Sequence, residues 1–206
     1  VNPINDAPTI SALTGAPGFV ENAPAAVRLD ADGSVTVADA ELGGNWNGAT
    51  LTVQRSGTAQ AQDVFSFIDD DTGNPALGVQ TSGANLVVDG VTIGSFTNTG
   101  GRLTVTFNAS ATAPLVGKAM GAVAYLNNSD APAASAQINF VLNDRNSNVT
   151  GGGTSGAGQN QGGGGQLSAT RSVTVAITRI NDAPGISALD ATSVNSYTEN
   201  GPAIQI

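Results

Sequence analysis

Segments in which apolar and polar residues alternate recur along most of the chain. LTVTF at 103–107 and VTVAI at 173–177 place an apolar side chain at every second position, which is the period of a strand with one buried and one solvated face. Gly, Asn, Asp and Pro separate these segments and favour turns. The pattern predicts strands at 34–39, 49–55, 63–69, 85–96, 102–108, 122–127, 136–144 and 168–180. Short strands joined by turns predict an all-β fold, an antiparallel β-sandwich.

Two segments depart from the alternation. ATAPLVGKAM at 111–120 predicts one short helix, with Thr112 as the cap, Pro114 in the first turn, and an apolar face of Leu115, Val116 and Ala119. The stretch 150–166 is rich in Gly and has no apolar anchor that would offset the entropy lost on ordering. It lies between two predicted strands, so we expect a flexible Gly-rich hairpin loop.

The chain repeats its own opening. INDAPTISAL at 4–13 returns as INDAPGISAL at 180–189, and FVENAPAAV at 19–27 has a counterpart in YTENGPAIQ at 197–205. A self-match at a fixed period indicates an array of similar units. We therefore predict a tandem repeat protein. The predicted divisions are an inter-repeat linker at 1–14, one repeat at 15–180, and a linker with the first strand of the next repeat at 181–206.

The composition excludes several classes of function. Sixteen Asp and Glu stand against seven Lys and Arg, a net charge of −9, whereas binding a phosphate backbone needs clustered cations. Nucleic acid is therefore not expected as a partner. The chain has no Cys and no His, which excludes disulfides, zinc sites built on these residues and a Ser-His-Asp triad. No apolar run approaches the length of a bilayer span, and membrane insertion is not expected.

Many of the acidic residues fall where predicted strands begin or end. Asp6 and Asp182 lie in the repeated INDAP segment, Asp39 and Glu41 follow the strand at 34–39, and Asp144 closes the strand at 136–144. Strand ends of a sandwich meet at its two poles, and carboxylates gathered there repel one another unless a cation joins them. Calcium suits such oxygen ligands on loops. The alternative is that these are ordinary solvated turn residues.

The same motifs resemble those of cadherin repeats. FVENAPAAV resembles the first cadherin strand with its calcium-ligating Glu, DAELGGN at 39–45 resembles the pattern of two acids, Gly and Asn, and INDAP resembles the inter-repeat linker. The stretch from GRLTVTFNASATA to VAITRINDAP is similar to cadherin-like repeats of very large bacterial surface and adhesin proteins of the RTX-adhesin type. The resemblance implies an Ig-like, Greek-key β-sandwich and calcium as the bound ion.

The resemblance also implies two half-sites for calcium. The leading pole, where the chain enters the repeat, would use Asn5, Asp6, Asp39, Glu41, Asn45 and Asp144. The trailing pole, where the chain leaves, would use Glu21, Asn181 and Asp182. Cadherin units are shorter and carry a second acidic motif at the trailing pole, which this chain lacks, so that pole is expected to hold fewer ligands.

Three functions follow as expectations. The leading one is a calcium-stiffened extension repeat of a secreted bacterial cell-surface adhesin or biofilm-matrix fibre, located outside the cell and mediating cell adhesion, with adjacent repeats of the same chain as partners. A carbohydrate-binding module for exopolysaccharide is the second, with Trp46 either covering the mouth of the sandwich, the reading we favour, or stacking on sugar. A filament subunit assembled by strand addition through 196–206 is the third. An enzyme is not expected.

Overall fold

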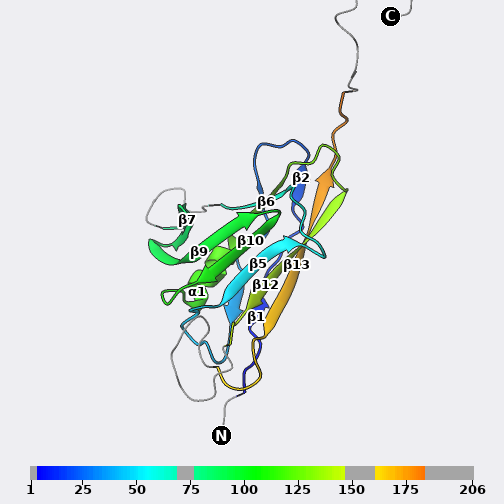
Figure 1. The fold of residues 1–206 in the computed structure, drawn as a ribbon. Coiled ribbons are helices and arrows are strands. Elements are labelled where there is room, and N and C mark those ends of the chain that lie inside the picture. Colours follow the sequence, from blue (N-terminus) through cyan, green and yellow to red (C-terminus); the bar gives the residue numbers. More distant parts are fainter. Residues whose placement is uncertain (1–3, 69–76, 147–160, 184–206) are drawn as a thin grey trace, which may run out of the picture.

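The computed structural model describes residues 4–68, 77–146 and 161–183. Of these residues, 46% lie in strands and 6% in the one helix, so this part of the chain is mostly β-sheet, as the alternating pattern predicted. Within these residues no helix is long and apolar enough to cross a membrane. The chain forms two packed layers of strands in an elongated molecule (Figure 1).

An eight-stranded sheet makes the larger layer. Its order is β2 (Gly18–Val20), β13 (Ser168–Thr178), β12 (Ser135–Asn143), β5 (Thr50–Arg55), β10 (Arg102–Phe107), β9 (Val91–Thr99), β8 (Asn85–Val88) and β7 (Val79–Ser82). In the described parts of the chain, the strands of every named pair run antiparallel except β2 and β13, which are parallel. The predicted antiparallel arrangement is therefore confirmed with one exception.

Shorter elements form the second layer. A three-stranded sheet has the order β3 (Val27–Arg28), β11 (Val123–Asn127) and β6 (Asp63–Phe67), a two-stranded sheet pairs β1 (Thr9–Ser11) with β4 (Thr36–Ala38), and α1 spans Ala113–Gly121. The core lies between the layers. Phe140 of β12 and Val53 of β5 are fully buried on the large sheet, and Phe19 of β2 meets Tyr125 of β11 edge-on with ring centroids 6.0 Å apart.

Most element predictions are confirmed, and one strand prediction is wrong. The segment 85–96 is not one strand but the hairpin of β8 and β9, because Asp89 and Gly90 take positive φ values of 50° and 75°. Asp-Gly is a favoured pair for such a two-residue turn. The helix begins after Thr112 as predicted, although the Thr112 side chain makes no capping hydrogen bond. Val116 and Ala119 are buried against the core.

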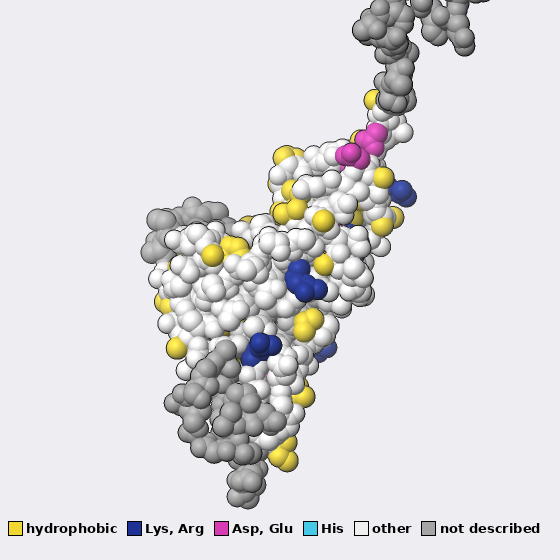
Figure 2. All heavy atoms as spheres, in the orientation of Figure 1, with side chains coloured by type: hydrophobic (Ala, Val, Ile, Leu, Met, Phe, Trp, Pro, Cys, Tyr) yellow, Lys and Arg dark blue, Asp and Glu magenta, His cyan; other side chains and the backbone are white. Residues whose placement is uncertain are grey.

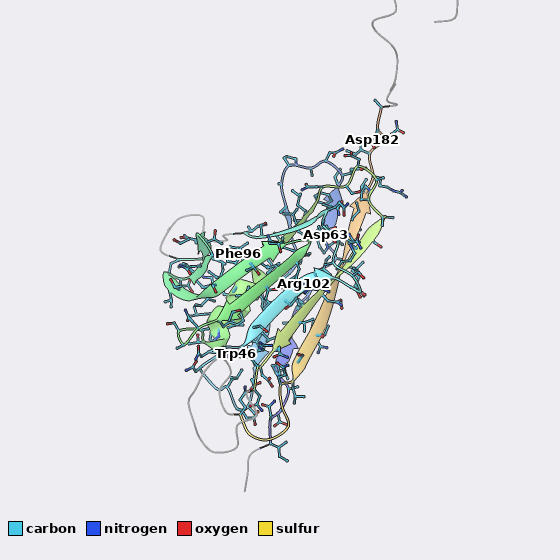
Figure 3. All side chains as sticks on the ribbon, viewed as in Figure 1. Trp46, Asp63, Phe96, Arg102 and Asp182 are labelled. Atoms are coloured by element: carbon cyan, nitrogen blue, oxygen red, sulfur yellow. The ribbon has the colours of Figure 1, made fainter. Side chains whose placement is uncertain are left out.

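The two ends of the unit lie far apart, because β13 runs along the molecule from one end to the other (Figure 1). At the lower end, where the chain enters, Ile4 forms a β-bridge with Gly163. At the upper end the chain leaves past Asp182 (Figure 3). Residues 9–11, predicted to lie in a linker, form β1 and bury Ile10 in the core. The predicted next-repeat strand, within 184–206, lies outside the described residues.

Candidate cation sites at the two poles

Asp144 is the centre of the leading pole. It follows β12 directly and is completely buried. Its Oδ2 accepts a hydrogen bond from Asn5 Nδ2 at 2.6 Å, and its Oδ1 accepts the backbone N–H groups of Asn146 at 3.0 Å and Leu167 at 2.9 Å. Asn5, in the repeated INDAP segment, is thus fixed to a carboxylate 139 positions away in the sequence.

Asn5 is buried at the leading pole and uses only part of its hydrogen-bonding capacity. Its side chain also donates to the carbonyl oxygen of Gly165 at 2.9 Å, and its backbone N–H donates to the carbonyl oxygen of Gly163 at 2.9 Å. Both contacts of Nδ2 are with acceptors, which fixes the orientation of the amide. The buried Oδ1 has no hydrogen-bond partner.

Asp39 and Glu41 bring a second pair of carboxylates to this pole. Asp39 follows β4, and its Oδ1 accepts the N–H groups of Glu41 at 3.0 Å and Leu42 at 2.8 Å, while its buried Oδ2 has no partner. Glu41 Oε2 accepts the N–H of Asp6 at 3.1 Å. Burial raises the pKa of Asp39 above its ordinary value, and the charges of Glu41 and Asp144 raise it further, against the two N–H donors.

Asn45 lies in the same loop as Asp39 but is exposed. Its Oδ1 accepts the N–H of Asn47 at 3.0 Å, which is an Asx turn. The structure therefore brings Asn5, Asp6, Asp39, Glu41 and Asp144 to the same pole, linked by pairwise contacts, and gives the oxygen of Asn45 a local role.

Glu21 defines the trailing pole. It follows β2 and is 2% exposed. Its backbone N–H donates to the carbonyl oxygen of Thr178 at 2.9 Å, and its Oε2 accepts the N–H of Ile180 at 2.8 Å. The other carboxylate oxygen, Oε1, is buried without a partner. A carboxylate is thus held against the segment that leaves the unit.

Asn181 and Asp182 follow this contact and are both exposed. Asn181 Nδ2 donates to the carbonyl oxygen of Asp182 at 3.3 Å. Figure 2 shows acidic side chains where the chain leaves the upper end of the molecule. Among the described contacts, no hydrogen bond joins either residue to Glu21. The contact of Glu21 with Ile180 therefore brings the three trailing-pole candidates to the same end of the molecule without closing them into a site.

The oxygens at the two poles differ in kind, which bears on the cation that they could bind. Within the described ranges, no three acidic side chains are grouped closely enough to hold a metal ion by themselves. The available donors are mixed instead: carboxylates, an amide oxygen and the backbone carbonyls of the Gly-rich segment. Calcium accepts such a mixture. Asn5 Oδ1, Asp39 Oδ2 and Glu21 Oε1 are buried oxygens that lack partners, and an oxygen in that condition is what a cation would satisfy.

Sequence reasoning missed part of the leading pole. Asn146 is buried and donates to the carbonyl oxygens of Gly162 at 2.9 Å and Gly165 at 3.2 Å, and Gln161 Nε2 donates to the carbonyl oxygen of Asp144 at 3.1 Å. Residues 161–166 of the predicted flexible loop are therefore joined to this pole, while 150–160 lie outside the described residues. The spacing Asp144-x-Asn146, which parallels Asp39-x-Glu41, was the available signal.

Trp46 is completely buried, which supports its predicted role as a cover and excludes an exposed sugar platform. Its backbone N–H donates to the carbonyl oxygen of Ala111 at 2.9 Å. Figure 3 shows it in the lower half of the molecule.

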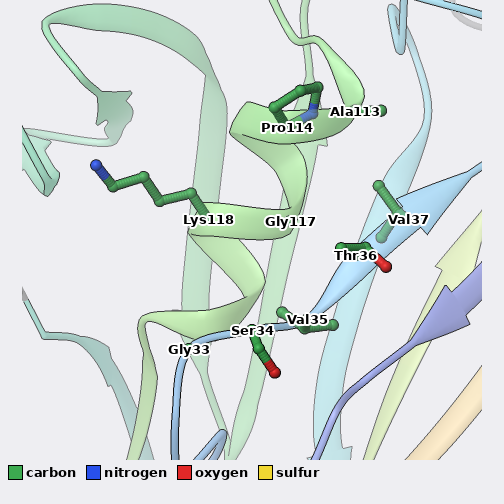
Figure 4. Close-up of a pocket in the computed structure, with 9 residues that line it drawn as sticks. All are labelled: Gly33, Ser34, Val35, Thr36, Val37, Ala113, Pro114, Gly117 and Lys118. Carbon is green, nitrogen blue, oxygen red and sulfur yellow. The ribbon is translucent and has the colours of Figure 1, made fainter.

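A groove of about 530 Å³ lies between α1 and β4. Figure 4 shows its lining, in which Lys118 carries the only charge and extends away from β4. Lys118 Nζ contacts Asp89 Oδ1 at 2.6 Å. The groove thus offers no acid–base pair among the residues that line it.

Comparison with known proteins gave no match to any family model, curated protein or solved structure.

Proposed function

We propose that this chain is a structural extension repeat, stiffened by calcium, of a secreted bacterial cell-surface adhesin or biofilm-matrix fibre. The observation that carries the proposal is the presence of buried, unpartnered oxygens at both poles, among them Asn5 Oδ1, Asp39 Oδ2 and Glu21 Oε1. The cadherin-like order of acidic motifs supports the same ion and the same extracellular setting. The unit would hold a distal adhesive domain away from the cell surface.

Electrostatics favours a cation at the leading pole. A buried oxygen without a partner costs about 1–3 kcal/mol, and Asp39 bears this cost beside the charges of Glu41 and Asp144. A divalent ion would bind the free oxygens of Asn5 and Asp39, and its charge would offset the repulsion of Asp39 by Glu41 and Asp144. Asp6, whose backbone N–H donates to Glu41, would add one carboxylate from the INDAP segment to this pole.

The trailing pole would be a weaker half-site. Glu21 presents one free oxygen, and Asn181 and Asp182 directly follow Ile180, whose N–H donates to Glu21. Extracellular calcium modules bind with Kd values of roughly 10⁻⁴–10⁻³ M. At ten times Kd, one such site stabilises the folded chain by about 1.4 kcal/mol, enough to hold a short joint and still be reversible.

A calcium titration tests the proposal. The melting temperature of the full chain should rise with calcium and fall again with chelator, by about 2–4 °C for each kcal/mol in a chain of this size. Terbium luminescence excited through Trp46, the only tryptophan, should appear on binding and be displaced by calcium, because Trp46 belongs to the same loop as Asp39. Asp130→Asn is the matched control for substitutions of the pole carboxylates, since Asp130 is exposed on another loop. A melting temperature unmoved by 10-fold changes across millimolar calcium, without terbium luminescence, would end the proposal.

A further inference from the structure

The INDAP segment, here called the joint between units, occurs twice in the sequence. The structure describes the beginning of each copy, and the two lie in different environments. Ile4 and Asn5 enter this unit, and Ile180 and Asn181 occupy the same positions in the second copy of the motif. The first pair shows how a joint contacts the unit that follows it. The second pair shows how a joint contacts the unit that precedes it. The two sets of contacts can therefore be combined on a single joint.

Contact with the following unit begins at the Asn. Asn5 is 4% exposed, its backbone N–H donates to the carbonyl oxygen of Gly163 at 2.9 Å, and its side chain donates to Asp144 at 2.6 Å. Asn181, beside which the described residues form no such unit, is exposed. The environment that buries Asn5 is the one that Asn181 lacks.

Contact with the preceding unit ends at the Ile. The backbone N–H of Ile180 donates to Glu21 Oε2 at 2.8 Å, and the carbonyl of Thr178, two residues earlier, accepts the N–H of Glu21 at 2.9 Å. Ile180 is 48% exposed, whereas Ile4 is 75% exposed. Val20, at the end of β2 beside Glu21, is also exposed, at 46%.

We infer that a second copy of this unit docks directly on the trailing pole, so that one peptide bond, Ile180–Asn181, separates the last residue held by one unit from the first residue held by the next. No residue of the joint is then free of both units. The angle between neighbouring units is set by hydrogen bonds on both sides of this bond, with Val20 and Ile180 as the apolar part of the contact. The inference shares with the proposed function only the tandem array, because it requires no metal ion.

A tandem duplication provides the test. Residues 1–179 are followed directly by residues 4–206 of a second copy, which keeps the natural spacing of 176 residues between Ile4 and Ile180. Because the chain has no cysteine, spin labels can be placed through Thr174→Cys in the first copy and Thr170→Cys in the second, both exposed positions on β13. Pulsed electron paramagnetic resonance then gives the distribution of distances across the joint.

The expected result is a narrow distance distribution in calcium and in chelator. A Gly-Gly insertion between Ile4 and Asn5 of the second copy should broaden it at least about twofold, since glycine linkers behave as flexible chain. The same insertion after Gly57 of the first copy, in an exposed loop, should leave the width unchanged. An unmodified tandem as broad as the joint insertion, in calcium or in chelator alone, overturns the inference. A narrow joint in a protein that fails the calcium titration would instead refute the proposed function alone.

Discussion

The side chain of Asp39 both stabilises and destabilises the fold. One of its oxygens accepts two backbone N–H groups, and the other is buried without a partner near two further carboxylates. The first oxygen makes Asp39 part of the turn that follows β4, a role for which an amide oxygen would serve equally well. The negative charge has no partner in the fold, which is the basis for a test of calcium binding.

Asp39→Asn should have opposite effects without and with calcium. The Asn oxygen can accept both N–H groups, and the lost charge relieves the repulsion from Glu41 and Asp144, so without calcium the variant should melt no lower than the parent chain. With calcium, the rise in melting temperature should shrink, because a ligand has been lost. Differential scanning calorimetry with and without chelator measures both. A variant that melts several degrees lower in chelator would contradict this account of Asp39.

The raised pKa of Asp39 also gives a pH dependence. A carboxyl whose pKa is higher in the folded than in the unfolded chain binds its proton more tightly when folded, so its ionisation at neutral pH lowers stability. In chelator, stability should therefore rise as the pH falls through the raised pKa of Asp39, a gain complete below the unfolded value of about 3.9. Asp89, whose pKa is lowered by Lys118, acts in the opposite sense below about pH 4. Comparing the parent with Asp39→Asn isolates the contribution of Asp39.

Asp63 is a buried acid that the fold does satisfy. Its Oδ1 accepts hydrogen bonds from Arg55, Tyr125 and Asn127 at 2.6, 2.7 and 2.8 Å, and its Oδ2 accepts Arg55 Nε at 2.7 Å. Burial and the neighbouring Asp63 carboxylate raise the pKa of the Tyr125 hydroxyl, which keeps it protonated as a donor. This network joins β5, β6 and β11 across the two layers.

Asp63→Asn should destabilise the chain strongly and independently of calcium. Removing one partner of a buried ion pair costs about 3–5 kcal/mol, and the 19% exposure of the Arg55 side chain puts the expected loss at the lower end. Tyr125→Phe, which removes one hydrogen bond and no charge, should cost about 1–2 kcal/mol. Urea unfolding measures both losses. Equal losses for the two variants would mean that the charge pair contributes nothing beyond its hydrogen bonds.

Among the elements, β9 depends on a residue with no side chain. It forms an irregular pairing with β8, with a register shift between Leu86 and Val87. A Cβ at Gly94 would lie 2.2 Å from the carbonyl oxygen of Thr106 on β10, whereas a Cβ at Gly18 would meet nothing within 4 Å. The glycine therefore permits a close approach of two backbones at the bulge.

Gly94→Ala should destabilise the chain by about 1–3 kcal/mol, since β9 and β10 must separate to admit the methyl group. Gly18→Ala, also in a strand, is the matched control and should change the free energy of unfolding by less than about 0.5 kcal/mol. Chemical denaturation of both variants tests the comparison. A Gly94→Ala chain as stable as the control would show that β9 and β10 can separate at this point without loss of stability.

The elements also show where sequence reasoning succeeded and failed. Strands β5, β10, β12 and β13 were predicted because their alternation runs for six residues or more. The short strands β1 and β7, of three and four residues, carry too few positions for a period to be recognised. The hairpin at Asp89–Gly90 could have been predicted from its turn chemistry, which the apolar run around it obscured.

At the scale of the whole molecule, the acidic residues of the poles could be predicted, but the hydrogen bonds that connect the poles could not. Strand-end acids identified Asp39, Glu41 and Asp144 as neighbours, because strand ends of a sandwich converge. Asn5 is held by hydrogen bonds to the backbone carbonyls of Gly163 and Gly165. Every residue has a backbone carbonyl, so the sequence does not indicate which ones accept these bonds. The same limit hid Gln161, whereas the spacing Asp144-x-Asn146 could have identified Asn146.

The parallel pairing of β2 with β13 bears on how the molecule responds to tension. The chain enters at one end and leaves at the other, so a pull on the two termini draws β2 back toward its start and β13 forward past its finish. The hydrogen bonds between them, from Ala176 to Pro17 and from Glu21 to Thr178, then lie across the force and are loaded in shear, all at once, instead of being unzipped singly. A pair of only three residues on each strand would then resist tension along the molecule by shear.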